Sequence, residues 1–144
     1  MKKIITALVI LFLMGCVTVK VPKYLKEEFP YRQDFYANFD RTFNATSDAL
    51  KQLGWKITET TTPTVFDPRI TDHKKQILIF TEIKQTPLFL ASAYSSLNAY
   101  LREIDEKYTQ VEIRYILMMP FFKTYQDDAL VDKIFEKIKD NLNK

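Results

Sequence analysis

The chain has 144 residues and a formal net charge of +3. Two of the positive charges, Lys2 and Lys3, lie at its start, and the rest of the chain has 19 basic against 18 acidic side chains. A protein that binds nucleic acid needs a positive surface to replace phosphate counterions, so this balance excludes nucleic acid as an expected partner.

The first predicted element is a secretory leader. Lys2 and Lys3 precede an uncharged apolar stretch, residues 4–14, of the length expected for the core of a signal peptide. A membrane-spanning helix needs roughly 20 apolar residues, so this stretch is too short to cross a bilayer. It is followed by Gly15 and by the only cysteine of the chain, Cys16.

The end of this leader resembles the lipobox of bacterial lipoproteins in Leu13, Met14, Gly15 and Cys16. The resemblance implies that the sulfur of Cys16 accepts a diacylglyceryl group, that residues 1–15 are cleaved off, and that the new amino terminus is acylated. Each buried methylene contributes about 0.8 kcal/mol, so two or three acyl chains make an effectively permanent membrane anchor. The alternatives are an ordinary signal peptide with a chance cysteine, or a buried core thiol.

The residue after the cysteine bears on the location of the anchor. In double-membrane bacteria, lipoproteins without Asp at this position usually move to the outer membrane, and here it is Val17. The resemblance therefore implies an anchor in the outer membrane, facing the periplasm. In a bacterium with one membrane it implies the outer face of the cytoplasmic membrane.

Residues 16–37 are expected to form the lipidated N-terminus and a tether. The stretch mixes charges with two prolines and shows no sustained hydrophobic period. Four aromatic residues, Tyr24, Phe29, Tyr31 and Phe35, are more than a flexible linker needs. They leave open the alternative that part of the segment packs on the domain or on a partner.

A single domain is expected over residues 38–144, and it begins with a helix. Asn38 or Asp40 can cap the helix start, and Gly54 can end it in the left-handed conformation. Apolar residues recur at spacings of three and four, as in an amphipathic helix. This stripe consists of Phe39, Phe43, Thr46, Leu50 and Leu53.

Alternating residues predict four strands after this helix, at 55–60, 76–84, 96–104 and 109–117. In the last of them Val111, Ile113 and Tyr115 alternate with Glu112 and Arg114, which predicts one core face and one solvated face. Residues 87–94 are expected to form a short helical or irregular insertion. A helix or a strand over 87–101 stays open.

The last element is a helix over residues 127–144. Asp127 or Asp128 can cap it, and its apolar stripe is Val131, Ile134, Phe135, Ile138 and Leu142. The order helix, four strands, helix predicts an α+β fold: a two-layer sandwich of a four-stranded antiparallel sheet and two packed helices.

Reactive groups are scarce. The single histidine, His73, and the single cysteine exclude a zinc or copper site of the usual nitrogen and sulfur ligands, so we expect no metal. Two glycines, Gly15 and Gly54, are too few for a phosphate-binding or dinucleotide-binding loop, so we expect no cofactor. Adjacent acidic pairs lie where helix capping and turns account for them. No catalytic residue is predicted.

Two apolar connections are the candidate interaction surface. They join predicted elements without belonging to a regular stripe, and exposed apolar patches mark binding surfaces. The alternative is that the same side chains complete the core. The candidate residues are Leu88, Phe89, Leu90, Met118, Met119, Phe121 and Phe122.

The runs FNATSDALKQLGWKI and YTQVEIRYI resemble a broad group of small bacterial lipoproteins, whose domain is similar to that of component C of the outer-membrane β-barrel assembly machinery. The likeness covers residues 38–142 and implies a non-enzymatic adaptor. We therefore expect a lipid-anchored module that binds an envelope protein in outer-membrane assembly or maintenance. The alternative is a carrier that holds a lipid or another apolar ligand between sheet and C-terminal helix.

Overall fold

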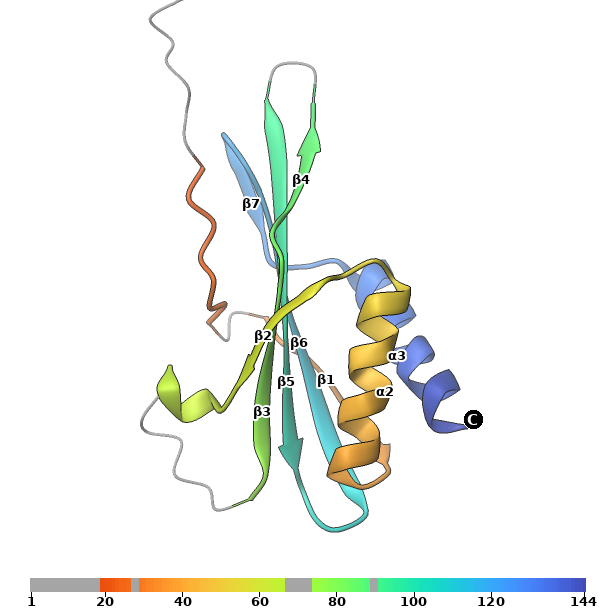
Figure 1. The fold of residues 1–144 in the computed structure, drawn as a ribbon. Helices are drawn as coiled ribbons and strands as arrows, with labels where there is room; N and C mark the ends of the chain where they lie inside the picture. Colours follow the sequence, from red (N-terminus) through yellow and green to blue (C-terminus); the bar gives the residue numbers. More distant parts are fainter. Residues whose placement is uncertain (1–18, 27–28, 67–73, 89–90) are drawn as a thin grey trace, which may run out of the picture.

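The computed structural model describes residues 19–26, 29–66, 74–88 and 91–144 (Figure 1). Cys16, His73, Phe89 and Leu90 lie outside these ranges. In chain order the elements are β1 (Tyr31–Tyr36), α2 (Phe39–Gln52), β2 (Ile57–Thr61), the 3₁₀ turn η1 (Pro63–Val65), β3 (Gln76–Thr81), β4 (Lys84–Pro87), β5 (Ser92–Glu103), β6 (Tyr108–Met119), β7 (Phe122–Thr124) and α3 (Asp128–Leu142).

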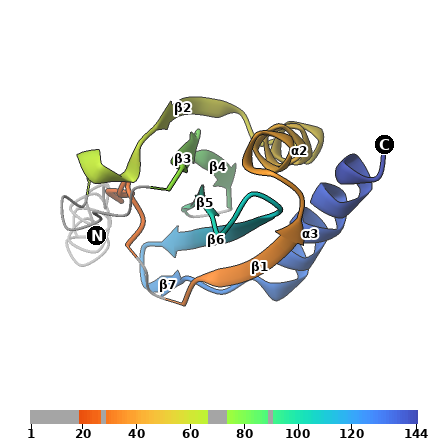
Figure 2. The same cartoon turned by 90° about the horizontal axis from the view of Figure 1, so that it is seen from below.

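The strands form one antiparallel sheet in the order β1-β6-β5-β3-β2, with β4 paired to β5 and β7 paired to β6. Figure 2 shows α2 and α3 on one side of this sheet. The α+β class, with two helices and an antiparallel sheet, is confirmed. The expected number of four strands is wrong, because the described residues form a sheet of seven.

The first of the additional strands, β1, lies in the stretch expected to be a tether. It pairs along its whole length with β6, from Tyr31 opposite Ile113 to Tyr36 opposite Tyr108. The expected order, which starts with a helix, is therefore also wrong. As an edge strand β1 has exposed charged side chains at Arg32 and Asp34. Its alternation is weak in the sequence, because polar Gln33 is on the less exposed side and aromatic Tyr36 on the exposed side.

Both helices begin as their sequences predict, and α2 also ends at the predicted glycine, whereas α3 ends at Leu142, two residues before the end of its predicted range. The side chain of Asn38 accepts a hydrogen bond from the N–H of Arg41 at the start of α2, and Asp127 does the same for Leu130 at the start of α3. Gly54 follows α2 with a φ of +77°. Its N–H donates to the carbonyl of Lys51, a C-terminal cap that a residue with a Cβ adopts only at a cost.

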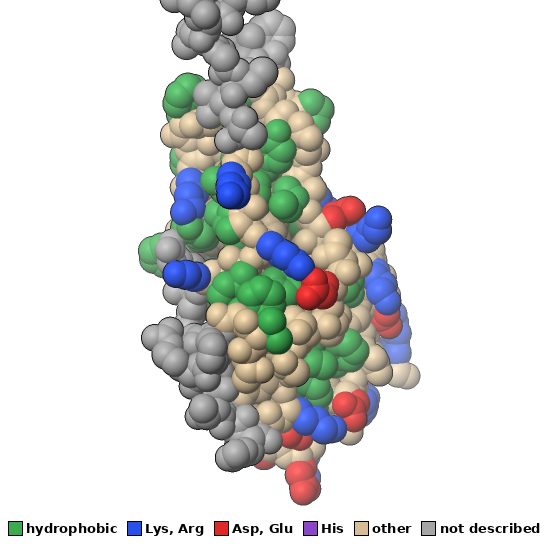
Figure 3. Space-filling model, turned by 60° about the vertical axis from the view of Figure 1, so that its left-hand side comes forward, with side chains coloured by type: hydrophobic (Ala, Val, Ile, Leu, Met, Phe, Trp, Pro, Cys, Tyr) green, Lys and Arg blue, Asp and Glu red, His purple; other side chains and the backbone are tan. Residues whose placement is uncertain are grey.

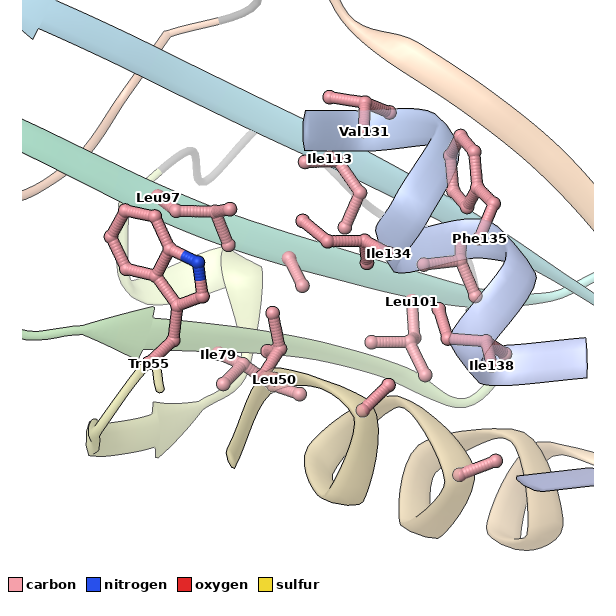
Figure 4. Packing of buried hydrophobic residues seen from close by; sticks show 14 of the residues in the cluster. Leu50, Trp55, Ile79, Leu97, Leu101, Ile113, Val131, Ile134, Phe135 and Ile138 are labelled. Carbon is pink, nitrogen blue, oxygen red and sulfur yellow. The ribbon is translucent and has the colours of Figure 1, made fainter. Parts of the chain in front are cut away.

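The apolar stripes of the two helices pack against one face of the sheet. Figure 4 shows side chains of α2 and α3 together with those of β3, β5 and β6 in one cluster. The buried side chains that it labels are Leu50, Trp55, Ile79, Leu97, Leu101, Ile113, Val131, Ile134, Phe135 and Ile138. The interface between sheet and α3 is thus filled by the main core.

The expected helical or irregular insertion at 87–94 is wrong for Pro87 and for residues 92–94, which lie in strands, while Phe89 and Leu90 are outside the described residues. Lys84 to Pro87 form β4, and Ser92 begins the long strand β5, which pairs back onto β4. The spacing of apolar residues there is compatible with a helix, but pairing with β4 and β6 satisfies the backbone hydrogen bonds of these residues. Tertiary pairing therefore decides the conformation.

The opposite face of the sheet carries the buried apolar side chains of Leu78, Phe80 and Ile116, which are not part of the main core cluster. Residues 19–26, here called the strap, run across this face (Figures 1 and 2). Leu25 of the strap is fully buried. The strap thus packs on the domain, which was the open alternative for the expected tether.

Candidate functional site

Two β-hairpins project together from one end of the sheet (Figure 1). The first joins β4 to β5 and is closed by a 2.8 Å hydrogen bond from the N–H of Leu88 to the carbonyl of Ala91. The second joins β6 to β7, with Met119 opposite Phe122. Tyr94 of β5 lies opposite Met118 of β6, so the two hairpins share one surface. We call this part, residues 84–88, 91–95 and 117–124, the hairpin end.

The structure brings the described members of the predicted interaction surface together at the hairpin end. Phe121 is 94% exposed, Phe122 52% and Leu88 47%, whereas Met118 and Met119 are half-buried. Phe89 and Leu90 are outside the described residues. Large apolar side chains that stay exposed at one end of a domain are typical of a surface that contacts something else.

The charged side chains of the hairpin end are all basic. The sequence has no acidic residue between Glu82 and Glu103, and none between Glu112 and Asp127. Its two lysines are Lys84 and Lys123. Figure 3 shows hydrophobic side chains toward this upper end, and both hydrophobic and acidic ones from the middle of the molecule to its lower end.

Both lysines lie over aromatic rings. The Nζ atom of Lys84 is 3.8 Å from the ring centre of Trp55, and that of Lys123 is 4.4 Å from the ring centre of Tyr125. Burial lowers the pKa of Lys84, an effect that the nearby carboxylate of Glu82 opposes. These rings hold the two cations against the surface of the hairpin end.

The other end of the sheet is acidic. Asp105 and Glu106 lie in the turn between β5 and β6 and are exposed. The side chain of Asp105 accepts hydrogen bonds from the N–H groups of Lys107 and Tyr108, at 2.7 and 2.8 Å. This carboxylate therefore closes a turn, as its sequence context predicts.

A buried ion pair on the strap face is the feature that sequence reasoning missed. Glu112 and Arg114, expected on a solvated face, are both buried, and their side chains are 2.5 Å apart. Arg32 completes the cluster with a 2.8 Å bond to Glu112. Burial alone would lower the pKa of Arg114, but the charge and hydrogen bond of Glu112, with the hydroxyl of Tyr24, raise it overall.

The strap is what removes this ion pair from water. Arg114 donates to the hydroxyl of Tyr24 at 3.1 Å and to the carbonyl of Leu25 at 3.0 Å. The N–H of Leu25 donates to the side chain of Asn98 at 2.8 Å. Tyr24 stacks on Phe66 with ring centres 5.1 Å apart. The signal available in the sequence was the aromatic and apolar content of the expected tether.

Among the described residues, no three His, Cys, Asp or Glu side chains gather as they would around a metal ion. None of the helices in the described ranges is long and apolar enough to span a membrane. No family model matches the chain, and no curated protein matches it either. The hairpin end and the strapped ion pair are therefore interpreted from their own geometry.

Proposed function

We propose that the chain is a lipoprotein of the bacterial envelope, anchored through lipid on Cys16, whose domain acts by contact and not by catalysis. Its contact surface is the hairpin end. The observation that carries this proposal is the exposure of Phe121, Phe122 and Leu88 at one end of the sheet, in stretches of the sequence without acidic residues. In a double-membrane bacterium the anchor lies in the outer membrane, where the domain takes part in assembly or maintenance.

The carrier alternative has no comparable support. A ligand between sheet and C-terminal helix would need the space that Ile113, Ile134 and Ile138 occupy in the main core. These three side chains are fully buried. We therefore propose contact as the single mode of action.

The anchor is tested by Cys16→Ser. We expect this variant to remain an unprocessed precursor without lipid, because the sulfur is the acceptor and cleavage depends on its modification. Metabolic labelling of cells with a palmitate analogue measures the result. Equal labelling of the wild type and the variant would contradict the anchor.

The contact surface is tested by photo-crosslinking in cells. A photoreactive phenylalanine analogue replaces Phe121 or, as the control, Tyr36, which is aromatic, 70% exposed and at the opposite end of the sheet. We expect crosslinked adducts of the chain, with lipid or with another protein, from position 121 and few from position 36. Phe122→Asp should reduce the adducts at 121 while the thermal melt is unchanged, because a charge is costly in a desolvated contact and tolerated in water. Equal adducts at 121 and 36 would contradict the proposal.

A further inference from the structure

The strap fixes where the chain leaves the domain on its way to Cys16. Its docked residues, Tyr24 and Leu25, bind Arg114 and Asn98 in the middle of the sheet. From there the N-terminal part of the strap, red in Figure 1, runs toward the end of the molecule where β4 and β7 lie. The N-terminal side of the strap thus emerges at the hairpin end and not at the acidic end.

The reach from Val19 to the anchor is short. Cys16 is three residues before Val19, and a fully extended chain covers about 3.3 to 3.6 Å per residue, so the two are at most about 11 Å apart. A membrane that holds lipid on Cys16 therefore comes within about 11 Å of Val19 while the strap is docked. The hairpins project from the domain in the same direction (Figure 1).

We infer that the hairpin end lies on the lipid surface that holds the anchor, with Phe121, Phe122 and Leu88 at the boundary between headgroups and acyl chains. This inference rests on the proposed function and names the occupant of its contact surface. Apolar side chains flanked by lysines are the chemistry of a protein surface that lies in this interface. Lys84 and Lys123, the two charged residues of the hairpin end, suit an anionic lipid surface.

The charge distribution favours the same orientation. The acidic turn with Asp105 and Glu106 lies at the far end of β5, a strand of 12 residues that spans about 40 Å. It is thus held away from anionic headgroups, and the part of the domain free of carboxylates is turned toward them.

The test uses the mature chain with its lipid in protein-free vesicles of phosphatidylethanolamine and phosphatidylglycerol. Phe121→Cys or Tyr36→Cys supplies the only free thiol, because the sulfur of Cys16 carries lipid. A fluorophore is attached to the introduced thiol. Nitroxide groups on the upper acyl chains quench a fluorophore that touches the interface. We expect quenching at position 121 to be roughly threefold stronger or more than at position 36, since only the former reaches the acyl boundary.

Flotation of the vesicles tests the lipid anchor separately from the membrane contact of the hairpin end. A chain that floats but shows equal quenching at positions 121 and 36 would overturn the membrane contact and leave the anchor standing. A chain that does not float would overturn the anchor, and the inference with it. Shielding of position 121 in native membranes but not in lipid vesicles would identify a protein as the occupant and would also overturn the inference.

A substitution in the strap tests whether the strap orients the domain on the membrane. Leu25→Asp places a charge in a buried site and should release the strap, whereas the matched control Lys26→Asp changes an exposed neighbour. Release would leave residues 17–30 as a tether of up to about 45 Å. We expect quenching at position 121 to fall toward that at position 36 in Leu25→Asp only. Unchanged quenching would overturn the orientation by the strap.

Discussion

Glu112→Leu is expected to destabilise the domain by about 3 to 5 kcal/mol, because it leaves the buried guanidinium of Arg114 without its counter-charge. The two side chains are buried and only 2.5 Å apart under the strap, so little water reaches the unpaired cation. Chemical denaturation of the domain measures the change in the free energy of unfolding.

Two further variants make this result specific. The double variant Glu112→Leu with Arg114→Met should recover much of the lost stability, because an apolar pair of similar volume replaces a buried ion pair at little cost. Glu82→Gln removes the acid of an exposed pair with Lys56, at 3.9 Å, and should cost at most about 1 kcal/mol. A loss as small for Glu112→Leu as for Glu82→Gln would mean that the strap does not exclude water.

Ile134→Ala is expected to cost about 2 to 5 kcal/mol, and so is Leu50→Ala, because each removes a fully buried side chain from the main core and leaves a cavity. The two residues come from α3 and α2 and meet over the same face of the sheet (Figure 4). Asp132→Ala, an exposed change on the same helix as Ile134, is the control and should lie within about 0.5 kcal/mol of wild type. Melting curves that coincide for all three variants would contradict the packing.

The helices were predictable from the sequence because their signals are local. A stripe of period 3.6 such as Val131, Ile134 and Ile138 needs no knowledge of the rest of the chain, and Gly54 marks its helix end by its own backbone freedom. Strands β4 and β7, with four and three residues, are too short to show a period. They exist because the long strands β5 and β6 extend beyond the main sheet and offer them partners.

In the candidate site, too, only the features with a local signal could be predicted from the sequence. The exposure of Phe121 and Phe122 could be predicted in part, because apolar residues in a connection belong to no stripe. The burial of Glu112 and Arg114 could not, since alternation with Val111 and Ile113 is the pattern of a half-solvated strand. What covers that face comes from a segment far away in sequence, as Leu25 and Arg114 are 89 positions apart.

Strand β1 pairs with β6, which comes much later in the chain, and this separation affects the order in which the sheet forms. Arg32 of β1 lies opposite Glu112 of β6, 80 positions later, whereas β5 and β6 meet across a short turn. Contacts between distant parts of a chain form slowly, so the β5–β6 hairpin can form long before β1 reaches it. Until then the outer edge of β6 presents unpaired N–H and C=O groups to any strand nearby. In a crowded compartment the first strand of a neighbouring copy competes for that edge, and the misfolded product to expect is a dimer in which two chains have exchanged β1.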